Sequence, residues 1–299
     1  MDLLGAVGGT PLLELARISR EAGVAARVFA KAEFFNPSGS VKDRAAKAMI
    51  LDGMRSGALV GGGALADATS GNTGIAYAMF GASLGFRVRL YMPANTSPER
   101  KRIIRSYGAE IVETDPLEGS DGAYLAVRAA VAAEPGRFFY PDQYNNPANP
   151  TAHYETTGAE IWEQTEGGVT HFITGMGTSG TFTGVSRRLK RENGSVRAYA
   201  VQPDSPFHGI EGTKHMGSTI KPGNLDESLI DGIVTVSTEE AYAMARRLAA
   251  AEGLFVGISS GGNVAAALKL AKTLPEGALV ATVLCDGGSR YLTDDFWEA

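Results

Sequence analysis

Cysteine is almost absent from this chain of 299 residues, which has a single one, Cys285. One cysteine excludes a disulfide within the chain and fits a reducing compartment. Cys285 ends the apolar run 280–285, which is typical of a buried strand. We therefore expect a buried and unreactive thiol.

Long apolar runs are also missing. No stretch approaches the roughly 18 uninterrupted apolar residues that a membrane span requires. The first residues lack the basic start and the apolar core of a signal peptide. We expect a cytoplasmic protein that makes no membrane contact.

Neither a basic surface nor a metal motif can be found. The 28 Lys and Arg residues are outnumbered by 33 Asp and Glu residues, which gives a net charge of −5, and both signs are mixed throughout. This balance argues against nucleic acid as a partner. The four histidines do not have a metal-binding spacing such as H-E-x-x-H, so no metal site is predicted.

Predicted strands and helices alternate along most of the chain. The length fits two domains or one large one, with a seam near 145–150. Alternation of this kind indicates an α/β protein with a mainly parallel sheet covered by helices. The segment 203–231 has no regular pattern, and such long segments are usually functional or mobile. Strands are predicted over 28–33, 64–68, 86–92, 109–114, 137–140, 169–174, 195–202, 232–236 and 278–284. Among the helices predicted between them, one runs without a break over 151–164.

Lys42 lies between a Pro/Gly/Ser turn and a helix-favouring run, 45–51. The positive end of a helix dipole favours the neutral amine of a lysine over its charged ammonium. A neutral lysine attacks aldehydes, which is the chemistry of Schiff-base enzymes. Charged residues near helix ends are common, so Lys42 taken alone also fits an ordinary solvated lysine.

The segment 175–181, Gly-Met-Gly-Thr-Ser-Gly-Thr, follows a predicted strand, opens a predicted helix and matches the dinucleotide pattern G-x-G-x-x-G. Two details favour a phosphate monoester instead. The next strand ends in Gln202 rather than in the acidic residue that binds a ribose. Three hydroxyl residues also crowd the loop, and hydroxyls at a helix N-terminus suit a terminal phosphate.

Two more loops have a similar composition. The segment 69–74, Thr-Ser-Gly-Asn-Thr-Gly, suits a carboxylate, although a well-capped helix has the same pattern. The segment 257–262, Gly-Ile-Ser-Ser-Gly-Gly, also fits a serine N-cap. Strand-to-helix loops gather at one edge of a parallel sheet. A reactive lysine, a phosphate site and a carboxylate site together point to pyridoxal phosphate.

With these motifs the sequence resembles the cysteine synthase family, which are fold-type-II (tryptophan-synthase-β-like) pyridoxal-phosphate enzymes. The resemblance runs from Gly8 to Leu292. Ser179 makes the phosphate loop similar to the cysteine synthase B branch, and Ala159 replaces a usual proline, a change that we expect to be silent. The matching motifs are 36–44, 69–74, 142–158, 177–181 and 257–261.

The resemblance implies two domains, each with a mainly parallel twisted sheet flanked by helices. A smaller and mobile N-terminal domain would comprise 1–12 and 36–147. A larger C-terminal domain would comprise 13–35 and 148–299. It also implies an active site in the interdomain cleft and a homodimer.

The resemblance further assigns roles to single residues. Lys42 is implied as the Schiff-base lysine, Asn72 as a ligand of the cofactor's 3′-oxygen, and Ser259 as the contact of the pyridine nitrogen. The implied phosphate ligands are Gly177, Thr178, Ser179, Gly180 and Thr181. The implied substrate-binding residues are Thr69, Ser70, Gly71, Asn72, Thr73 and Gln143.

The implied activity is a β-replacement. An O-activated serine, either O-acetylserine or O-phosphoserine, reacts with sulfide through an aminoacrylate intermediate to give L-cysteine. A neutral serine at the ring nitrogen makes the ring a weaker electron sink, which suits prompt loss of a β-leaving group. Lys42, once displaced by the substrate amine, would act as the general base at Cα.

Lys214 lies in the long irregular segment. In the family this region borders the substrate side chain, so Lys214 could pair with a phosphate on the substrate. A solvated loop lysine fits the sequence equally well.

Several alternatives remain open from the sequence. A cystathionine β-synthase or a serine/threonine dehydratase would have the same fold. A nucleotide-binding oxidoreductase would use the loop 175–180 for a dinucleotide. A catalytically silent binding protein is disfavoured because Lys42, Asn72 and Ser259 are all present.

Overall fold

The computed structural model describes residues 2–69 and 71–298. Its strands are β1 (Leu12–Glu14), β2 (Arg27–Ala32), β3 (Ala64–Ala68), β4 (Arg87–Pro93), β5 (Glu110–Thr114), β6 (His171–Gly175), β7 (Arg197–Pro203), β8 (Gly232–Val236) and β9 (Leu279–Leu284). Its α-helices are α1 (Ala16–Glu21), α2 (Lys42–Arg55), α3 (Asn72–Leu84), α4 (Pro98–Ser106), α5 (Gly119–Ala133), α6 (Ala148–Glu155), α7 (Thr157–Gln164), α8 (Gly180–Glu192), α9 (Thr238–Arg247) and α10 (Ile258–Ala271).

The chain forms two compact units. The smaller consists of Met1–Val7 and Lys42–Asn149, and the larger of Gly8–Val41 and Pro150–Ala299. Each unit has its own sheet and its own hydrophobic cores. The domain bounds inferred from the resemblance, and the mobility of the smaller domain, stay predictions.

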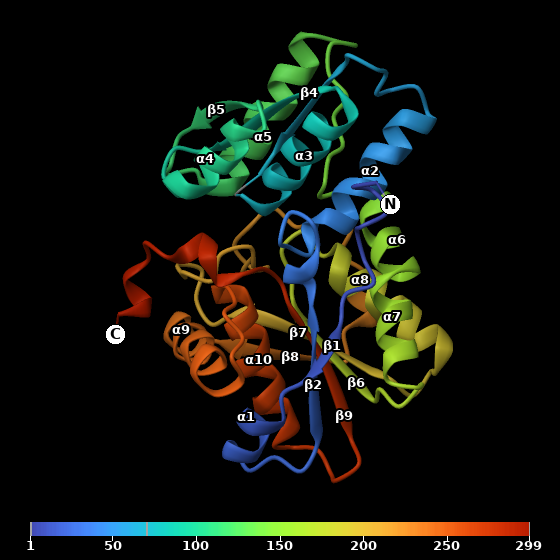
Figure 1. Cartoon of the computed structure of the whole chain (residues 1–299), viewed down its shortest axis with the longest axis vertical. Helices are drawn as coiled ribbons and strands as arrows, with labels where there is room; N and C mark the ends of the chain where they lie inside the picture. The colour runs from blue at the N-terminus through green and yellow to red at the C-terminus, as the bar shows by residue number, and fades with distance from the viewer. Residues whose placement is uncertain (1, 70, 299) are drawn as a thin grey trace. The chain divides into compact units, whose positions relative to one another are not determined.

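The larger unit is built on a six-stranded sheet of order β1-β2-β9-β6-β7-β8, parallel except where β1 meets β2. Helices cover both faces, with α1, α9 and α10 on one side and α7 and α8 on the other (Figure 1). The side chains of β9 point alternately to the two faces of the sheet. Val280 and Leu284 pack into the core on the side of α1, α9 and α10, and Ala281 and Val283 into the core on the side of α7 and α8. Burial on both faces explains why β9 is an unbroken apolar run.

The smaller unit contains a parallel sheet of order β3-β4-β5. Leu65 of β3 packs into a core with α2, α3 and α4, whereas Ala66 and Ala68 face a core that includes α5. The predicted strand 137–140 is reduced to a single parallel bridge between Phe139 and Leu65. This bridge still brings the segment after Phe139 beside the carboxyl end of β3.

The structure confirms the predicted α/β class with parallel-dominated sheets, and it corrects two local expectations. The helix predicted over 151–164 is two helices, α6 and α7, which meet at Thr156, where φ is −118°. Cys285 is only half-buried, since β9 ends one residue before it.

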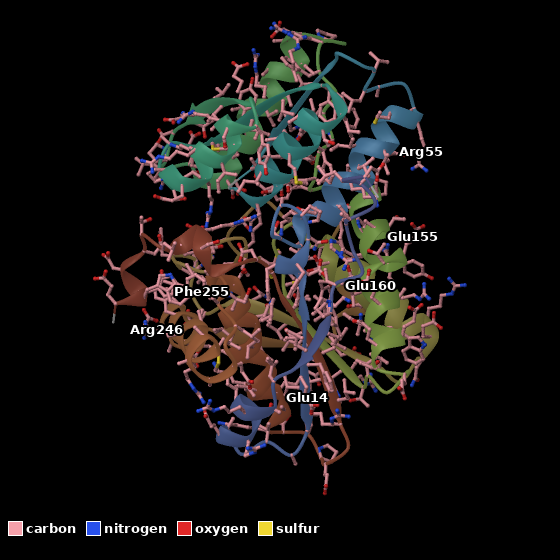
Figure 2. All side chains as sticks on the ribbon, in the orientation of Figure 1. Glu14, Arg55, Glu155, Glu160, Arg246 and Phe255 are labelled. Carbon is pink, nitrogen blue, oxygen red and sulfur yellow. The ribbon has the colours of Figure 1, made fainter. Side chains whose placement is uncertain are left out.

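Arg55 on α2 and Glu155 on α6 are exposed and point outward from their helices (Figure 2). Among the helices formed by residues 2–69 and 71–298, none has the length and apolar character that a membrane crossing requires.

Candidate active site

Buried polar side chains hold the turn ahead of Lys42. The fully buried carboxylate of Glu33 accepts hydrogen bonds from the Thr10 hydroxyl and the Asn36 amide, both at 2.8 Å. The Asn36 carbonyl oxygen accepts from the N–H of Gly8 at 3.0 Å. Satisfied buried polar groups make this frame rigid. Lys42 follows as the half-buried first residue of α2.

The same turn is tied to the segment after β9. The N–H of Val41 donates to the carbonyl of Cys285 at 2.8 Å, and Ser40 pairs with Asp286 in an antiparallel bridge. Gly39 has a left-handed φ of +82°, and a Cβ there would lie 3.2 Å from Nη2 of Arg290. A glycine is therefore needed where the chain turns toward α2.

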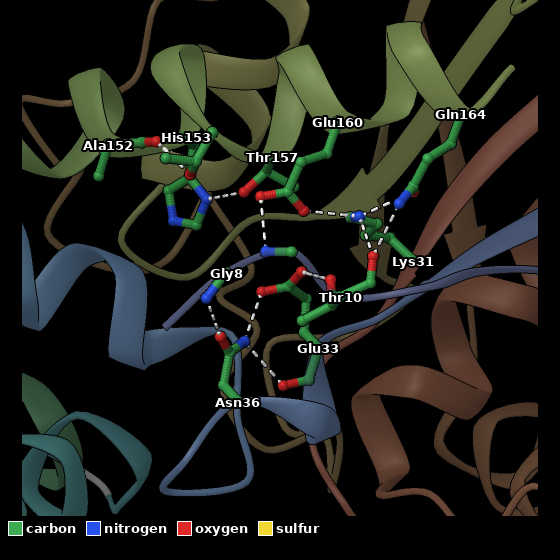
Figure 3. A network of polar contacts seen from close by, with 12 residues as sticks. Gly8, Thr10, Lys31, Glu33, Asn36, Ala152, His153, Thr157, Glu160 and Gln164 are labelled. Atoms are coloured by element: carbon green, nitrogen blue, oxygen red, sulfur yellow. Dashed lines mark hydrogen bonds and ion pairs between the residues drawn. The ribbon is translucent and has the colours of Figure 1, made fainter. Parts of the chain in front are cut away.

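A buried lysine, Lys31 on β2, fixes α7 to the sheet (Figure 3). Its Nζ lies 2.6 Å from Glu160 Oε2 and 2.9 Å from Gln164 Oε1, and it also donates to the carbonyl of Thr10. The other Glu160 oxygen accepts from the N–H of Gly9 at 3.0 Å. A buried ammonium without partners is costly, so Lys31 requires these contacts. Through them, the N-terminal segment of the larger unit is held in place.

The loop between β6 and α8 has a strained and unsatisfied serine. Ser179 adopts the left-handed φ of +64°, which is uncommon for a residue other than glycine. Its side chain is 3% exposed, and within the described part of the chain its Oγ has no hydrogen-bond partner. A Cβ at Gly177 would lie 2.2 Å from the carbonyl oxygen of Gly212, so only glycine fits there.

These features fit a phosphate. The first N–H groups of a helix lack partners within that helix, and the helix dipole adds positive charge at this end. A phosphate placed there would give the Ser179 hydroxyl the partner that a buried hydroxyl requires. The five residues predicted to bind phosphate all lie at this helix start, and their role as ligands stays a prediction.

His153, on α6, contacts the phosphate loop. Its Nε2 lies 3.2 Å from Oγ1 of Thr181. Its Nδ1 lies 2.9 Å from Oγ1 of Thr157, as Figure 3 shows. The ring is 2% exposed. This histidine is hydrogen-bonded through both ring nitrogens, and one of these contacts orients a hydroxyl of the loop.

Asn263 joins the phosphate loop to the start of α10. Its Oδ1 accepts from the N–H of Gly175 at 2.7 Å, and its Nδ2 donates to the carbonyl of Val283 at 2.8 Å. Ser259 lies one turn earlier on α10 and is 9% exposed. The predicted ligands of the phosphate and of the pyridine nitrogen therefore lie on neighbouring elements at the carboxyl edge of one sheet.

The loop between β3 and α3 closes on itself. Thr69 Oγ1 accepts hydrogen bonds from the N–H groups of Gly71 and Gly74, both at 3.1 Å. Asn72 begins α3 and is half-buried. Ser70, also predicted to bind substrate, lies outside the described residues.

Arg100, on α4, lies directly against this loop. A Cβ at Gly71 would be 2.6 Å from Cδ and 3.4 Å from Nη1 of Arg100, and the arginine is 4% exposed. A buried guanidinium adds positive charge behind a helix N-terminus. The loop is therefore suited to an anion such as a carboxylate.

Gln143, which lies near the C-terminal end of the smaller unit's sequence, contacts the same loop. Its Oε1 accepts from the Thr73 hydroxyl at 2.8 Å, and its Nε2 donates to the carbonyl of Ala68. Gln143 is 3% exposed. The structure thus brings together two residues that are 70 positions apart and that the sequence predicted to bind substrate.

Lys214 lies beside the phosphate loop. Its N–H donates to the carbonyl of Met176 at 2.8 Å, and its side chain is 7% exposed. The segment 203–231 is therefore packed against residues 175–177 at this point, and Lys214 is not a solvated surface lysine.

Three residues near these loops were not predicted from the sequence, namely Arg100, His153 and Asp286. Asp286 is fully buried, accepts from the Tyr291 hydroxyl at 2.7 Å, and would have its Oδ1 2.1 Å from a Cβ on Gly257. The i, i+4 spacing of His153 and Thr157 on a helix was an available signal. Arg100 and Asp286 gave no signal because only the fold brings them to the loops.

Comparison with known proteins decides the family. A family model described as pyridoxal-phosphate dependent enzyme matches residues 3–286. The cysteine synthase of Aquifex aeolicus is 50% identical over 295 residues, covering 97% of this chain and 90% of that protein. The cysteine synthase B of Salmonella typhimurium is 44% identical over 287 residues, covering 96% and 93%. The crystal structure of O-ureido-L-serine synthase matches with a TM-score of 0.93 at 39% identity, covering 100% of this chain and 95% of that one.

The chain belongs to the pyridoxal-phosphate-dependent enzymes. The predicted family, cofactor and fold-type-II class are confirmed. The alternative of a nucleotide-binding oxidoreductase is not supported. The loop 175–180 matches G-x-G-x-x-G, and a phosphate at a helix N-terminus is common to dinucleotides and to pyridoxal phosphate, so the pattern does not favour a dinucleotide.

Ser179→Ala tests whether the unpartnered hydroxyl serves the cofactor phosphate. Loss of one hydrogen bond to a charged group should weaken pyridoxal-phosphate binding roughly 10- to 100-fold. Titration of the apoenzyme with pyridoxal phosphate, followed by absorbance, gives the dissociation constant. Ser179→Gly keeps the left-handed backbone and loses the same hydroxyl, so it should weaken binding similarly. Ser195→Ala, on an exposed turn, is the control. Unchanged affinity in both Ser179 variants would contradict the assignment.

Proposed function

We propose that this enzyme is a cysteine synthase. It would break the Cβ–O bond of an O-activated L-serine and form a Cβ–S bond with sulfide, giving L-cysteine and, from O-acetylserine, acetate. The observation that carries the proposal is the shared sheet edge of Ser259 and the phosphate loop, which Asn263 fixes. The likeness to cysteine synthases over nearly the whole chain supports the same activity.

The loop 177–181 would hold the cofactor phosphate, Asn72 the 3′-oxygen and Ser259 the pyridine nitrogen. Bound pyridoxal phosphate supplies an aldehyde that captures the substrate amine and a ring that withdraws electrons from Cα. The Ser259 hydroxyl is neutral, so it does not hold a proton on the ring nitrogen. This favours loss of the β-substituent over a long-lived carbanion.

Lys42 would carry the proton transfers. Its amine would hold the cofactor aldehyde in the absence of substrate and, when free, would take the proton from the substrate Cα as general base. It returns that proton to Cα after sulfide has added at Cβ. The anion site at residues 69–74, with Gln143, would hold the substrate carboxylate while this occurs. Arg100 supports that site through its charge.

A homodimer in the cytoplasm completes the proposal. The single cysteine is consistent with a reducing compartment. A particle of the mass of one chain in sedimentation experiments would contradict the dimer.

Lys42→Ala should slow cysteine formation by orders of magnitude. Loss of a positioned general base lowers the rate of its step by roughly 10²- to 10⁴-fold. The assay follows L-cysteine from sulfide with O-acetylserine, O-phosphoserine or serine as the first substrate. Lys47→Ala is the matched control on the same helix, where the lysine donates to the Leu4 carbonyl at 2.7 Å. It should retain activity.

The same assay separates the alternatives within the fold. Wild-type enzyme should form cysteine faster from an O-activated serine than from serine. Preference for serine with homocysteine would indicate a cystathionine β-synthase instead. Release of a 2-oxo acid from serine without sulfide would indicate a dehydratase.

Lys214→Ala tests whether Lys214 recognises a phosphate on the substrate. A charge-assisted contact predicts roughly a 10- to 100-fold rise in KM for O-phosphoserine and little change for O-acetylserine. Lys221→Ala is the control, because Lys221 lies on the same segment and pairs with Glu227 at the surface. Equal losses on the two substrates would end the idea.

A further inference from the structure

A buried carboxylate, Asp67 on β3, joins the parts of the smaller unit that surround the anion site. Its Oδ1 accepts from the N–H of Ala68 at 2.8 Å. Its Oδ2 accepts from the Tyr77 hydroxyl at 2.9 Å and from the N–H of Gln143 at 3.3 Å. Asp67 is fully buried, and among the described residues no cation pairs with it.

These bonds connect Asp67 to the proposed substrate-binding residues. Tyr77 lies one helical turn after Thr73 on α3, and Gln143 contacts Thr73 directly. The backbone N–H of Gln143 is bound to Asp67, while its side-chain amide spans Ala68 and Thr73. Asp67 therefore fixes the start of α3 and Gln143 relative to β3.

The surroundings of Asp67 are acidic or weakly acidic. Burial, reinforced by the nearby negative charge of Asp142, raises the pKa of Asp67 to about 7, although the Tyr77 hydroxyl opposes the shift. Burial beside Asp67 also raises the pKa values of Tyr77, Tyr140 and Tyr144, so all three stay neutral. The titratable groups around the carboxylate are Tyr77 from α3, Tyr140, Asp142 and Tyr144 from the segment before α6, and, farther out, Asp121, Tyr124 and Arg128 from α5.

We propose that Asp67 is a positioning residue that takes up a proton when a carboxylate binds at residues 69–74. This rests on the proposed function, which assigns that loop to the substrate carboxylate. Asp67 lies two residues before Thr69 and is bonded to Gln143. Its negative charge therefore opposes an anion at the loop through a low-dielectric interior. Protonation of Asp67 removes the repulsion.

The sign of the linkage follows from this repulsion. A bound anion favours the protonated carboxyl, so the pKa of Asp67 is higher in the complex than in the unliganded enzyme. Binding then consumes a proton between the two pKa values. Affinity for the anion is highest below the lower pKa and falls as the pH rises through both.

Competitive inhibition by propionate tests the proposal. Propionate has the carboxylate but no amine, and it stays ionised above about pH 6 because ordinary carboxyl pKa values lie near 4. Its inhibition constant against O-acetylserine should rise about tenfold between about pH 6 and pH 8.5, which corresponds to a pKa difference of one unit. In Asp67→Asn, which has no proton to exchange at this site, the rise should be less than about twofold.

Two further variants keep the test decisive if Asp67→Asn folds poorly, since an amide cannot accept from all three donors. Tyr77→Phe removes a hydrogen bond that stabilises the carboxylate, so the midpoint of the pH dependence should move to higher pH. Asp142→Asn removes a negative charge, so the midpoint should move to lower pH. A merely structural role of Asp67 predicts no such opposite shifts.

The outcomes separate this inference from the proposed function. Equal pH slopes in wild type and Asp67→Asn, or unmoved midpoints in the other two variants, would overturn the role of Asp67 while cysteine formation stands. Failure of propionate to compete with O-acetylserine at any pH would overturn the assignment of the loop, and the inference with it.

Discussion

The larger unit's part of the site depends on the hydrogen bonds of one side-chain amide, that of Asn263. It is 2% exposed, accepts from the N–H of Gly175 and donates to the carbonyl of Val283. One buried group therefore ties the ends of β6 and β9 to α10. Loss of this amide would leave the half-buried N–H of Gly175 and the buried carbonyl of Val283 without these partners, which is costly.

The smaller unit places opposite charges around one anion site. Arg100 lies against Gly71 and attracts a carboxylate, whereas Asp67 lies behind Thr69 and Gln143 and repels one when it is ionised. Both side chains are buried, so solvent and salt screen them weakly. An exposed pair at the same positions would have little effect on binding. Because Asp67 is buried, its ionisation state affects the binding of a neighbouring anion.

Local patterns in the sequence predicted what depends on neighbouring residues. Alternating strands and helices indicated the parallel sheets. The loop compositions singled out 69–74 and 175–181, which lie at strand-to-helix junctions as expected. The break at Thr156 was missed although Thr156, Thr157 and Gly158 are weak helix formers, because the helical pattern resumes directly after them.

Contacts between distant parts of the chain could not be predicted in this way. The contacts of His153 with Thr181, and of Arg100 with Gly71, join residues on different elements, and no local spacing encodes them. The burial of Lys214 likewise depends on how an irregular segment packs against residues 175–177. Family resemblance supplied roles for Lys42, Asn72 and Ser259 that composition alone could not.

Borohydride reduction of the holoenzyme followed by peptide mass analysis tests the central claim most directly. The account predicts that the reduced cofactor is attached to Lys42 alone, at the start of α2. Attachment to Lys47 or to another lysine, or a failure to attach to any lysine, would contradict it.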